Sequence, residues 1–291
     1  MSAPDRTVRS GGRSVDERID LAQLDRDGCT TVELLSAAGV ADAIALLDSI
    51  QLPDGHAFYA SPAHDWGDRA RMIDLRLREI CDTRLRELLP DHRPFVSGFT
   101  SKGRRSGGPV TFHQDWTYTD ERLLRPVFLW CPLVDTDADN GGLEVVPGSH
   151  RWATGIRPSR SVPPTEAVAD RLHELSRPVA LRAGQALVFD PGVLHGSGPN
   201  PGDQPRPAFT IALVPTGAEL VHFHLDDAGE LTGYRVDETF FTMHPYGTRP
   251  DLEPSLEPWA DVVSVADLER GIERGIERAR PPRRWWRRHK R

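Results

Sequence analysis

The sequence predicts a mainly β protein, an antiparallel sandwich or barrel with helices on its flanks. After residue 94, short runs of β-forming residues follow one another closely and are separated by Gly, Pro, Asn and Asp, a spacing typical of antiparallel sheets. Before that point, two stretches show the period of amphipathic helices instead. At 291 residues, the chain is long enough for one large domain or two small ones.

The N-terminal part, residues 19–94, is expected to consist mainly of packed helices. Residues 20–50 suggest a short strand, CTTVEL, followed by a helix with apolar residues at an approximate helical period. Residues 66–89 suggest a second amphipathic helix, which ends before Pro90 because proline cannot continue a helix.

The β core is expected over residues 95–225. Its run VFLWCPLV contains almost no polar residue, which indicates a buried strand. The remaining runs of the core are FVSGF, VTFHQD, GLEVVP, QALVFD, AFTIALVP and ELVHFHL.

The rest of the chain completes a single predicted domain over residues 19–262. Periodicity fades over residues 226–262, which are expected to be rich in loops. Residues 1–18 lack the apolar middle of a signal peptide and are expected to be a disordered lead. Residues 263–291 are expected to form a short helix and a basic tail.

Charge is distributed unevenly along the chain. The last twelve residues, RPPRRWWRRHKR, carry seven positive charges and no acid; subtracting them from the net charge of −7 leaves about −14 for residues 1–279. An acidic body argues against nucleic-acid binding. The tail has three interpretations: a solvated end, contact with an anionic surface such as a membrane, or docking to an acidic partner.

Cysteine content and hydropathy bear on the compartment. The three cysteines are too few and too scattered for a disulfide framework or a C-x-x-C metal site, and no apolar run approaches the length of a membrane span. We therefore expect a cytoplasmic protein.

One pair of polar residues lies in an apolar and aromatic setting, in the stretch TFHQDWTY. Residues i and i+2 of a strand project from the same face, so His113 and Asp115 can direct an imidazole nitrogen and a carboxylate oxygen at one point. The spacing alone occurs often by chance, and a metal site needs at least one further ligand.

His195 is the best candidate for that ligand. It follows an apolar strand and lies in the Gly-rich turn HGSG, where backbones can approach closely. An antiparallel barrel can bring such a distant strand beside the first. His-x-Asp with a remote histidine is the 2-His-1-carboxylate set that suits non-haem Fe(II) and leaves coordination positions open.

Arg206 adds a second element. It begins the predicted strand RPAFTIALVP, eleven positions after His195, and its planar guanidinium matches a carboxylate at two points. A keto acid with two carboxylates could then bind the metal at one end and Arg206 at the other.

A second pair of histidines competes for the metal. His222 and His224 share one face of the run VHFHLDD and precede Asp226. This run lacks a Gly-rich partner strand, so strand packing or pocket lining is the favoured interpretation.

Several of these segments together resemble one known family. The stretches FHQDWTY, VFLWCPLVDTDADNGGLEVVPGSHR, GQALVFDPGVLHGSGPN and RPAFTIALVP, with LDRDGCTTVELLS near the start, are similar to the phytanoyl-CoA dioxygenase family of Fe(II)/2-oxoglutarate oxygenases. The resemblance runs from about residue 20 to residue 216. It implies a double-stranded β-helix, a cupin-like jelly roll, flanked by helices.

The resemblance also implies roles for individual residues. His113, Asp115 and His195 would be the iron ligands, and Arg206 would bind the distal carboxylate of 2-oxoglutarate. Thr111, Ser197 and Trp130 are weaker candidates for the cofactor site, and Trp116 and Tyr118 for the substrate site; Trp116 and Trp130 could equally be core residues.

The implied activity is that of a dioxygenase that uses Fe(II), 2-oxoglutarate and O2, hydroxylates a small molecule, and yields succinate and CO2. Related halogenases have a small residue in place of the carboxylate ligand, so Asp115 favours hydroxylation, with desaturation and cyclisation still open. The arginine-rich composition suggests a role in specialised-metabolite biosynthesis. Two alternatives stay open: a jelly-roll metal-binding protein without oxygenase activity, and a cupin-like isomerase or hydrolase that uses another divalent metal.

The substrate is not specified by the sequence. Its contacts are expected from the segments 50–70, 100–107, 151–170 and 217–250. Four arginines in or beside these segments are candidates to meet an anionic substrate: Arg104, Arg105, Arg151 and Arg157. A free, coenzyme A-linked or carrier-tethered substrate and any oligomeric state remain open.

Overall fold

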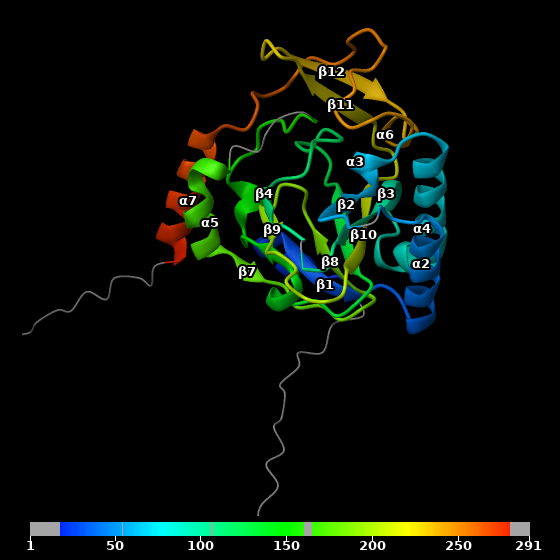
Figure 1. Ribbon diagram of the computed structural model, residues 1–291. Helices are drawn as coiled ribbons and strands as arrows, with labels where there is room; N and C mark the ends of the chain where they lie inside the picture. The colour runs from blue at the N-terminus through cyan, green and yellow to red at the C-terminus, as the bar shows by residue number, and fades with distance from the viewer. Residues whose placement is uncertain (1–17, 54, 106, 160–164, 280–291) are drawn as a thin grey trace, which may run out of the picture.

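Two antiparallel sheets face each other in the computed structural model, which describes residues 18–53, 55–105, 107–159 and 165–279 (Figure 1). Their strands are β1 (Cys29–Glu33), β2 (Phe58–Ala60), β3 (His92–Lys102), β4 (Val110–His113), β5 (Val127–Pro132), β6 (Leu143–Val145), β7 (Arg177–Pro178), β8 (Gln185–Phe189), β9 (His195–Ser197) and β10 (Arg206–Pro215). One sheet has the order β1-β8-β5-β10-β3-β2 and the other β4-β9-β6-β7. This arrangement confirms the predicted jelly roll.

Helices cover the outer face of each sheet (Figure 1). The helices are α1 (Leu21–Asp27), α2 (Ala37–Ser49), α3 (Ser61–His64), α4 (Asp68–Leu88), α5 (Ala169–Leu175), α6 (Phe240–Met243) and α7 (Val265–Ala279), with three short 3-10 turns at Ala138–Asn140, Ser149–Arg151 and Glu166–Val168. Apolar residues of α2 and α4 pack on the six-stranded sheet, and those of α5 and α7 pack beside the four-stranded sheet. The helix predicted at residues 66–89 is therefore α4.

The period-two pattern of the central strands separates two cores. In β10, Phe209, Ile211 and Leu213 point outward and pack with the residues under α2 and α4. Ala208 and Ala212 point the other way, into the apolar cluster between the two sheets. All six residues of β5 are buried, as expected for a strand covered on both faces. The even-numbered positions of β10, including Arg206, therefore face the interior of the jelly roll.

The expectation for the N-terminal part was incomplete. Besides its helices and the expected strand, which is β1, this part supplies β2; the two strands form the edges of the six-stranded sheet. Residues Cys29–Glu33 pair with Gln185–Phe189, more than 150 positions away. Local periodicity identified the strand but carries no information about its partner.

The last strand of the expected core, Leu220–Leu225, lies outside the two main sheets. The strands β11 (Leu220–Leu225) and β12 (Leu231–Val236) pair with each other in a separate two-stranded sheet and not with the jelly roll. This hairpin lies beyond one end of the two main sheets (Figure 1). The segment expected to be loops thus contains β12 and α6, whose short, mixed sequences LTGYRV and FFTM show little periodicity.

The ends of the chain and its helices bear on two further expectations. Most of the expected disordered lead, and the basic tail from residue 280 onward, lie outside the described residues. In the part of the chain that the structure describes, no helix is long and apolar enough to cross a membrane.

Candidate metal centre

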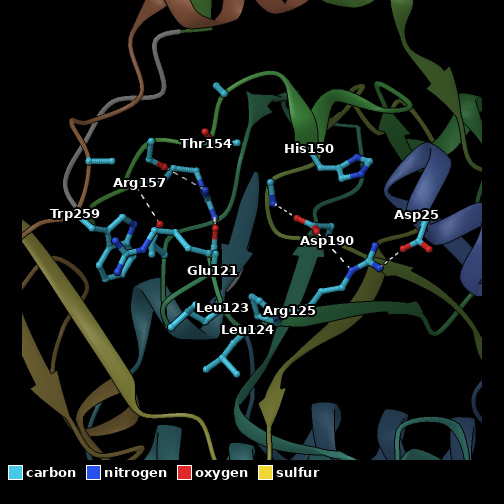
Figure 2. Close-up of a pocket in the computed structure, with 17 residues that line it drawn as sticks. Asp25, Glu121, Leu123, Leu124, Arg125, His150, Thr154, Arg157, Asp190 and Trp259 are labelled. Carbon is cyan, nitrogen blue, oxygen red and sulfur yellow. Dashed lines mark hydrogen bonds and ion pairs between the residues drawn. The ribbon is translucent and has the colours of Figure 1, made fainter.

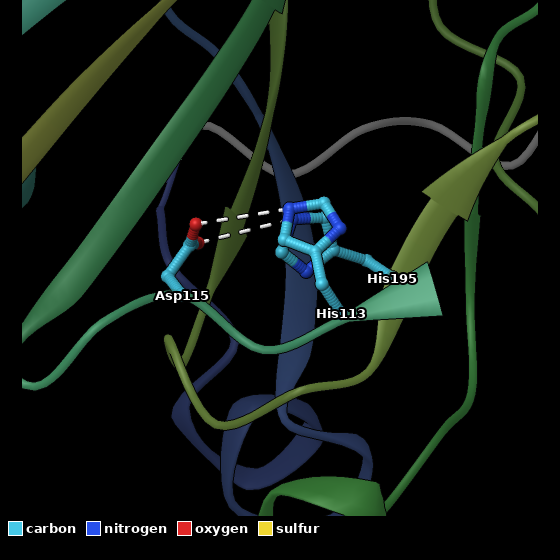
Figure 3. A group of neighbouring side chains, drawn as sticks. All are labelled: His113, Asp115 and His195. Carbon is cyan, nitrogen blue, oxygen red and sulfur yellow. Dashed lines mark ion pairs between the residues drawn. The ribbon is translucent and has the colours of Figure 1, made fainter. Parts of the chain in front are cut away.

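His113, Asp115 and His195 lie together at one end of the four-stranded sheet (Figure 3). The two histidines are directly opposite each other on the antiparallel strands β4 and β9, and their ring centres are 4.2 Å apart. The Asp115 carboxylate lies 4.0 Å from His113 Nε2 and 3.8 Å from His195 Nε2. One ligand atom from each residue lies within 4.8 Å of the others, so the predicted triad is brought together.

Asp115 reaches this point from a loop and not from the strand. β4 ends at His113, so the period-two argument applies only up to that residue. Beyond it, the Asp115 amide donates a hydrogen bond to the Pro191 carbonyl oxygen at 2.9 Å. Pro191 belongs to the segment that leads into His195, so one main-chain contact connects the two halves of the triad.

The protonation of the two rings follows from their hydrogen bonds. Nδ1 of His113 lies 2.9 Å from the Thr111 carbonyl oxygen, and Nδ1 of His195 lies 3.0 Å from that of Val193. A carbonyl oxygen only accepts, so each Nδ1 carries a proton, and Nε2 is the ring nitrogen left to bind a metal. Burial, and then the neighbouring His113, lower the pKa of His195 to about 4 despite the opposing effect of Asp115, which leaves this ring neutral at pH 7.

The three groups fit a bound cation. Asp115 Oδ2 is buried and has no hydrogen-bond partner among the described residues. It faces the Nε2 atoms of both histidines, and a buried carboxylate oxygen without a donor is costly unless a cation lies beside it. Two neutral imidazoles and one carboxylate are the ligand set preferred by non-haem Fe(II).

The main chain of Asp115 accepts a hydrogen bond from an arginine that is itself paired with a glutamate. Arg157 Nε donates to the Asp115 carbonyl oxygen at 2.5 Å, and Arg157 Nη2 donates to both carboxylate oxygens of Glu121 at 2.6 and 2.7 Å. The Arg157 and Thr117 main chains are also joined, with the Thr117 amide donating to the Arg157 carbonyl. Arg157 is only 5% exposed, so the expectation that it meets an anionic substrate was wrong.

Figure 2 shows this ion pair beside a cavity of about 730 Å³, which is separate from the cavity that contains the triad. Three arginines there are paired with acids: Arg157 with Glu121, Arg125 with Asp25 and Asp190, and Arg122 with Asp120 outside the cavity. No described residue lines both this cavity and the one that contains the triad.

The cavity that contains the triad has a volume of about 330 Å³ and also contains Arg206. The Arg206 guanidinium lies over the Trp130 ring, 5.2 Å from its centre, and the residue is 3% exposed. Its Nε and Nη1 atoms are buried and have no hydrogen-bond partner among the described residues. Burial lowers the pKa of Arg206 to about 10, so the group stays charged at neutral pH and a bound anion would satisfy it.

Of the weaker candidates for the cofactor and substrate sites, four line the cavity and one does not. Ser197, Trp130, Trp116 and Tyr118 line the same cavity, and Trp130 and Tyr118 also belong to the apolar cluster between the sheets. Thr111 is exposed and is not among the described residues that line the cavity, so the structure gives no support to its expected side-chain role. Its contribution is the carbonyl oxygen that accepts from His113.

Sequence reasoning missed Lys102, which is fully buried beside this site. Its Nζ donates to the carbonyl oxygens of Gly108 at 2.8 Å and Ser197 at 3.3 Å, and also to that of Gly198. Burial, and then the charge of Arg206, lower the pKa of Lys102 to about 8. The available signal was its rarity, since Lys102 and Lys290 are the only lysines in the sequence.

Comparisons with known proteins agree with this geometry. The family model for phytanoyl-CoA dioxygenase (PhyH) matches residues 48–208, a range that includes the triad and Arg206. The phytanoyl-CoA dioxygenase domain-containing protein 1 of Mus musculus is 34% identical over 116 residues, and that of Bos taurus is 35% identical over 117 residues. Each match covers 37% of this chain and 40% of the relative, so the chain matches about two fifths of these relatives' length.

Solved structures share the fold. The non-haem α-ketoglutarate-dependent epimerase SnoN from nogalamycin biosynthesis superposes with a TM-score of 0.53 at 21% identity, covering 84% of this chain and 94% of that one. A second structure, of SnoN with Fe3+, α-ketoglutarate and nogalamycin RO, has a TM-score of 0.52 at 20% identity, with 84% and 95% covered. Because the family model spans more than half of the sequence and contains every ligand of the metal centre, the chain belongs to the phytanoyl-CoA dioxygenase family.

Proposed function

We propose that the chain is a non-haem Fe(II)/2-oxoglutarate-dependent dioxygenase that hydroxylates a small organic molecule. Family membership supports an iron- and 2-oxoglutarate-dependent enzyme. The observation that carries the proposal is that one cavity contains both a group of residues that lacks a cation and a buried arginine that lacks an anion. The triad converges without a cation, and the buried Arg206 has no anion among the described residues.

The residues of the chain have distinct tasks in this proposal. His113, Asp115 and His195 would hold the iron through two Nε2 atoms and one carboxylate, and Arg206 would bind a carboxylate of 2-oxoglutarate. Bound iron and 2-oxoglutarate supply the oxidising chemistry, in which O2 is consumed and succinate and CO2 are released. The aromatic and aliphatic lining would lower the local polarity, which strengthens the electrostatic contacts inside.

Hydroxylation is the proposed outcome because Asp115 is present. A carboxylate at this position takes the place that a halide would need, which disfavours halogenation. A metal-binding protein without oxygenase activity, or an isomerase or hydrolase with another divalent metal, has no need of a buried arginine for a second carboxylate. Arg206 therefore favours the dioxygenase over both alternatives.

The test is anaerobic addition of Fe(II) and 2-oxoglutarate, followed by the visible charge-transfer band of the chelate. We expect the band in the wild type and its loss in His195→Ala. Arg206→Met is expected to retain iron but to bind 2-oxoglutarate at least about tenfold more weakly, because charged hydrogen bonds contribute roughly 1.5–3 kcal/mol each. A wild type without the band contradicts the proposal, and an unchanged affinity in Arg206→Met contradicts the role of Arg206.

A further inference from the structure

The charged groups of the active-site cavity belong to the metal centre and to Arg206, and most of its uncharged polar groups are engaged, with the Thr100 hydroxyl as an exception. Among the described lining residues, the triad and Arg206 supply every carboxylate, imidazole and guanidinium, and no lysine lines the cavity. Ser97 donates to the Asp74 carboxylate, the Gln114 amide donates to the Gly192 carbonyl at 2.6 Å, and the Thr210 hydroxyl donates to Gly98. Once iron and 2-oxoglutarate are bound, no charged group is left for a substrate.

A coenzyme A thioester would need cations that this cavity does not offer. Its phosphates are usually bound by lysine or arginine. Of the arginines expected to meet an anion, Arg157 pairs with Glu121, Arg105 pairs with Asp203, and Arg151 donates to the Asp25 carbonyl oxygen. Neither these three nor Arg104 is among the described residues that line the cavity.

Aromatic side chains form the part of the cavity that faces solvent. Of the three exposed aromatic residues in the described chain, Phe58, Trp66 and Tyr246, two line this cavity. Phe58 comes from β2 and is 37% exposed; Tyr246 comes from the loop after α6 and is 46% exposed. The Tyr246 ring packs on Trp116, with 4.2 Å between ring centres and 53° between planes. Exposed apolar surface beside a cavity is typical of a ligand site.

Tyr246 lines the same cavity as the triad and is also open to solvent. Burial, and then the nearby Asp115 carboxylate, raise the pKa of Tyr246 above its ordinary value, against the effect of its hydrogen bond with Tyr118. Its hydroxyl is therefore engaged by Tyr118, while the residue is partly exposed at the surface. Residue 246 also lies outside the range 48–208 that matches the family model, so this wall is supplied by a segment outside the matched region.

We propose that the substrate is an uncharged, compact molecule with a planar apolar part that packs against Trp116 and Tyr246, and that Tyr246 determines specificity. This proposal rests on the proposed function, because it assumes that iron and 2-oxoglutarate occupy the charged residues. The volume of about 330 Å³ is near the lower end of the range for small-molecule pockets, about 300–1,000 Å³, and 2-oxoglutarate shares it. Aromatic faces bind planar groups through offset or edge contacts.

The experiment uses the protein loaded anaerobically with Fe(II) and 2-oxoglutarate. The probes are 2-naphthol, its anionic counterpart 2-naphthoate, and benzoyl-CoA; the readouts are the shift of the charge-transfer band and the quenching of tryptophan fluorescence. We expect 2-naphthol to bind at least tenfold more tightly than either anion. Tyr246→Ala should weaken its binding roughly tenfold through loss of the ring contact, and Tyr246→Phe should retain most of it.

Trp66→Ala is the matched control, because Trp66 is 53% exposed but does not line the cavity; its affinity for 2-naphthol should equal that of the wild type. Tighter binding of benzoyl-CoA or 2-naphthoate, no binding of 2-naphthol to the loaded protein, or an unchanged affinity in Tyr246→Ala each overturn the proposal. Failure of the band to form before any probe is added contradicts the proposed function instead, so the two failures are distinct.

Discussion

Two pairs of neighbouring histidines lie in the described part of the chain, and one of them is arranged as a metal centre. His113 and His195 are opposite each other on neighbouring strands. His222 and His224 are two positions apart on β11, with ring centres 6.5 Å apart. Burial lowers the pKa of His195 and of His222 alike to about 4, with a neighbouring histidine as the second cause in each case. One buried histidine of lowered pKa is therefore common to both pairs.

The difference lies in the carboxylate. Asp115 directs a buried, unpartnered oxygen at its two histidines. Asp226 is exposed, and its Oδ1 accepts hydrogen bonds from the Ala228 and Glu230 amides in the turn between β11 and β12. Among the described residues, the triad is the one group of three or more His, Cys, Asp or Glu side chains arranged to hold a metal. A same-face His-x-His-x-Asp pattern therefore does not make a metal site when the aspartate carboxylate instead accepts hydrogen bonds from the amides of a turn.

His222 and His224 lie in packed surroundings and not at a metal site. The His222 ring packs on Phe240, and its Nε2 lies 3.3 Å from the Ser159 hydroxyl. These contacts join the β11–β12 hairpin to α6 and to the segment before residue 160. The interpretation of His222 and His224 as packing residues is consistent with this structure.

The largest expected effect tests the carboxylate directly. Asp115→Asn should lower the affinity for Fe(II) by more than about 100-fold, because changes to groups that only orient ligands already cost 10- to 100-fold. His222→Gln should leave the affinity unchanged. Anaerobic metal titration measures both, and equal losses in the two variants would remove the distinction between the pairs.

A smaller effect is expected from the ion pair that holds the Asp115 main chain. Glu121→Gln should lower Fe(II) affinity about 10- to 100-fold, because Arg157 then loses the partner that orients it toward the Asp115 carbonyl. Breaking a buried pair should also cost roughly 3–5 kcal/mol of unfolding free energy.

Glu87→Gln is the control for this ion pair, since Glu87 pairs with Arg84 on the exposed surface of α4. Metal titration and urea denaturation of both variants separate the two consequences. A Glu121→Gln protein that is destabilised but binds iron normally would show that the pair supports the fold alone.

The smallest expected effect is on the pH dependence of stability without metal. The pKa of His222 is about 4 in the folded protein, against an ordinary value of 6.5. Between these values the unfolded chain binds more protons, so this group makes stability fall as pH decreases from about 6.5 to about 4, by at most about 3 kcal/mol. Urea denaturation at pH 7 and pH 4.5 should show a smaller loss of unfolding free energy in His222→Gln than in the wild type. Equal losses in the two proteins would mean that a group other than His222 causes the pH dependence.

Much of the site could be predicted from the sequence because its residues lie in short patterns with chemical meaning. His113 and Asp115 form a two-residue spacing, His195 lies in a Gly-rich turn, and Arg206 begins a strand. Each pattern is local, and the resemblance to one family joined them. The jelly roll followed in the same way from the spacing of β-like runs.

What the sequence by itself determined, then, was the fold class, the family and the types of residue at the metal centre. The tertiary structure alone decided that Asp115 reaches the site from a loop, that Arg157 turns inward to Glu121, and that Tyr246 packs on Trp116. The physical reason is that these contacts join residues 36 to 130 positions apart or depend on where a strand ends. Alternation within a strand specifies which face a side chain occupies, whereas the partner across that face is specified only when the sheets have packed.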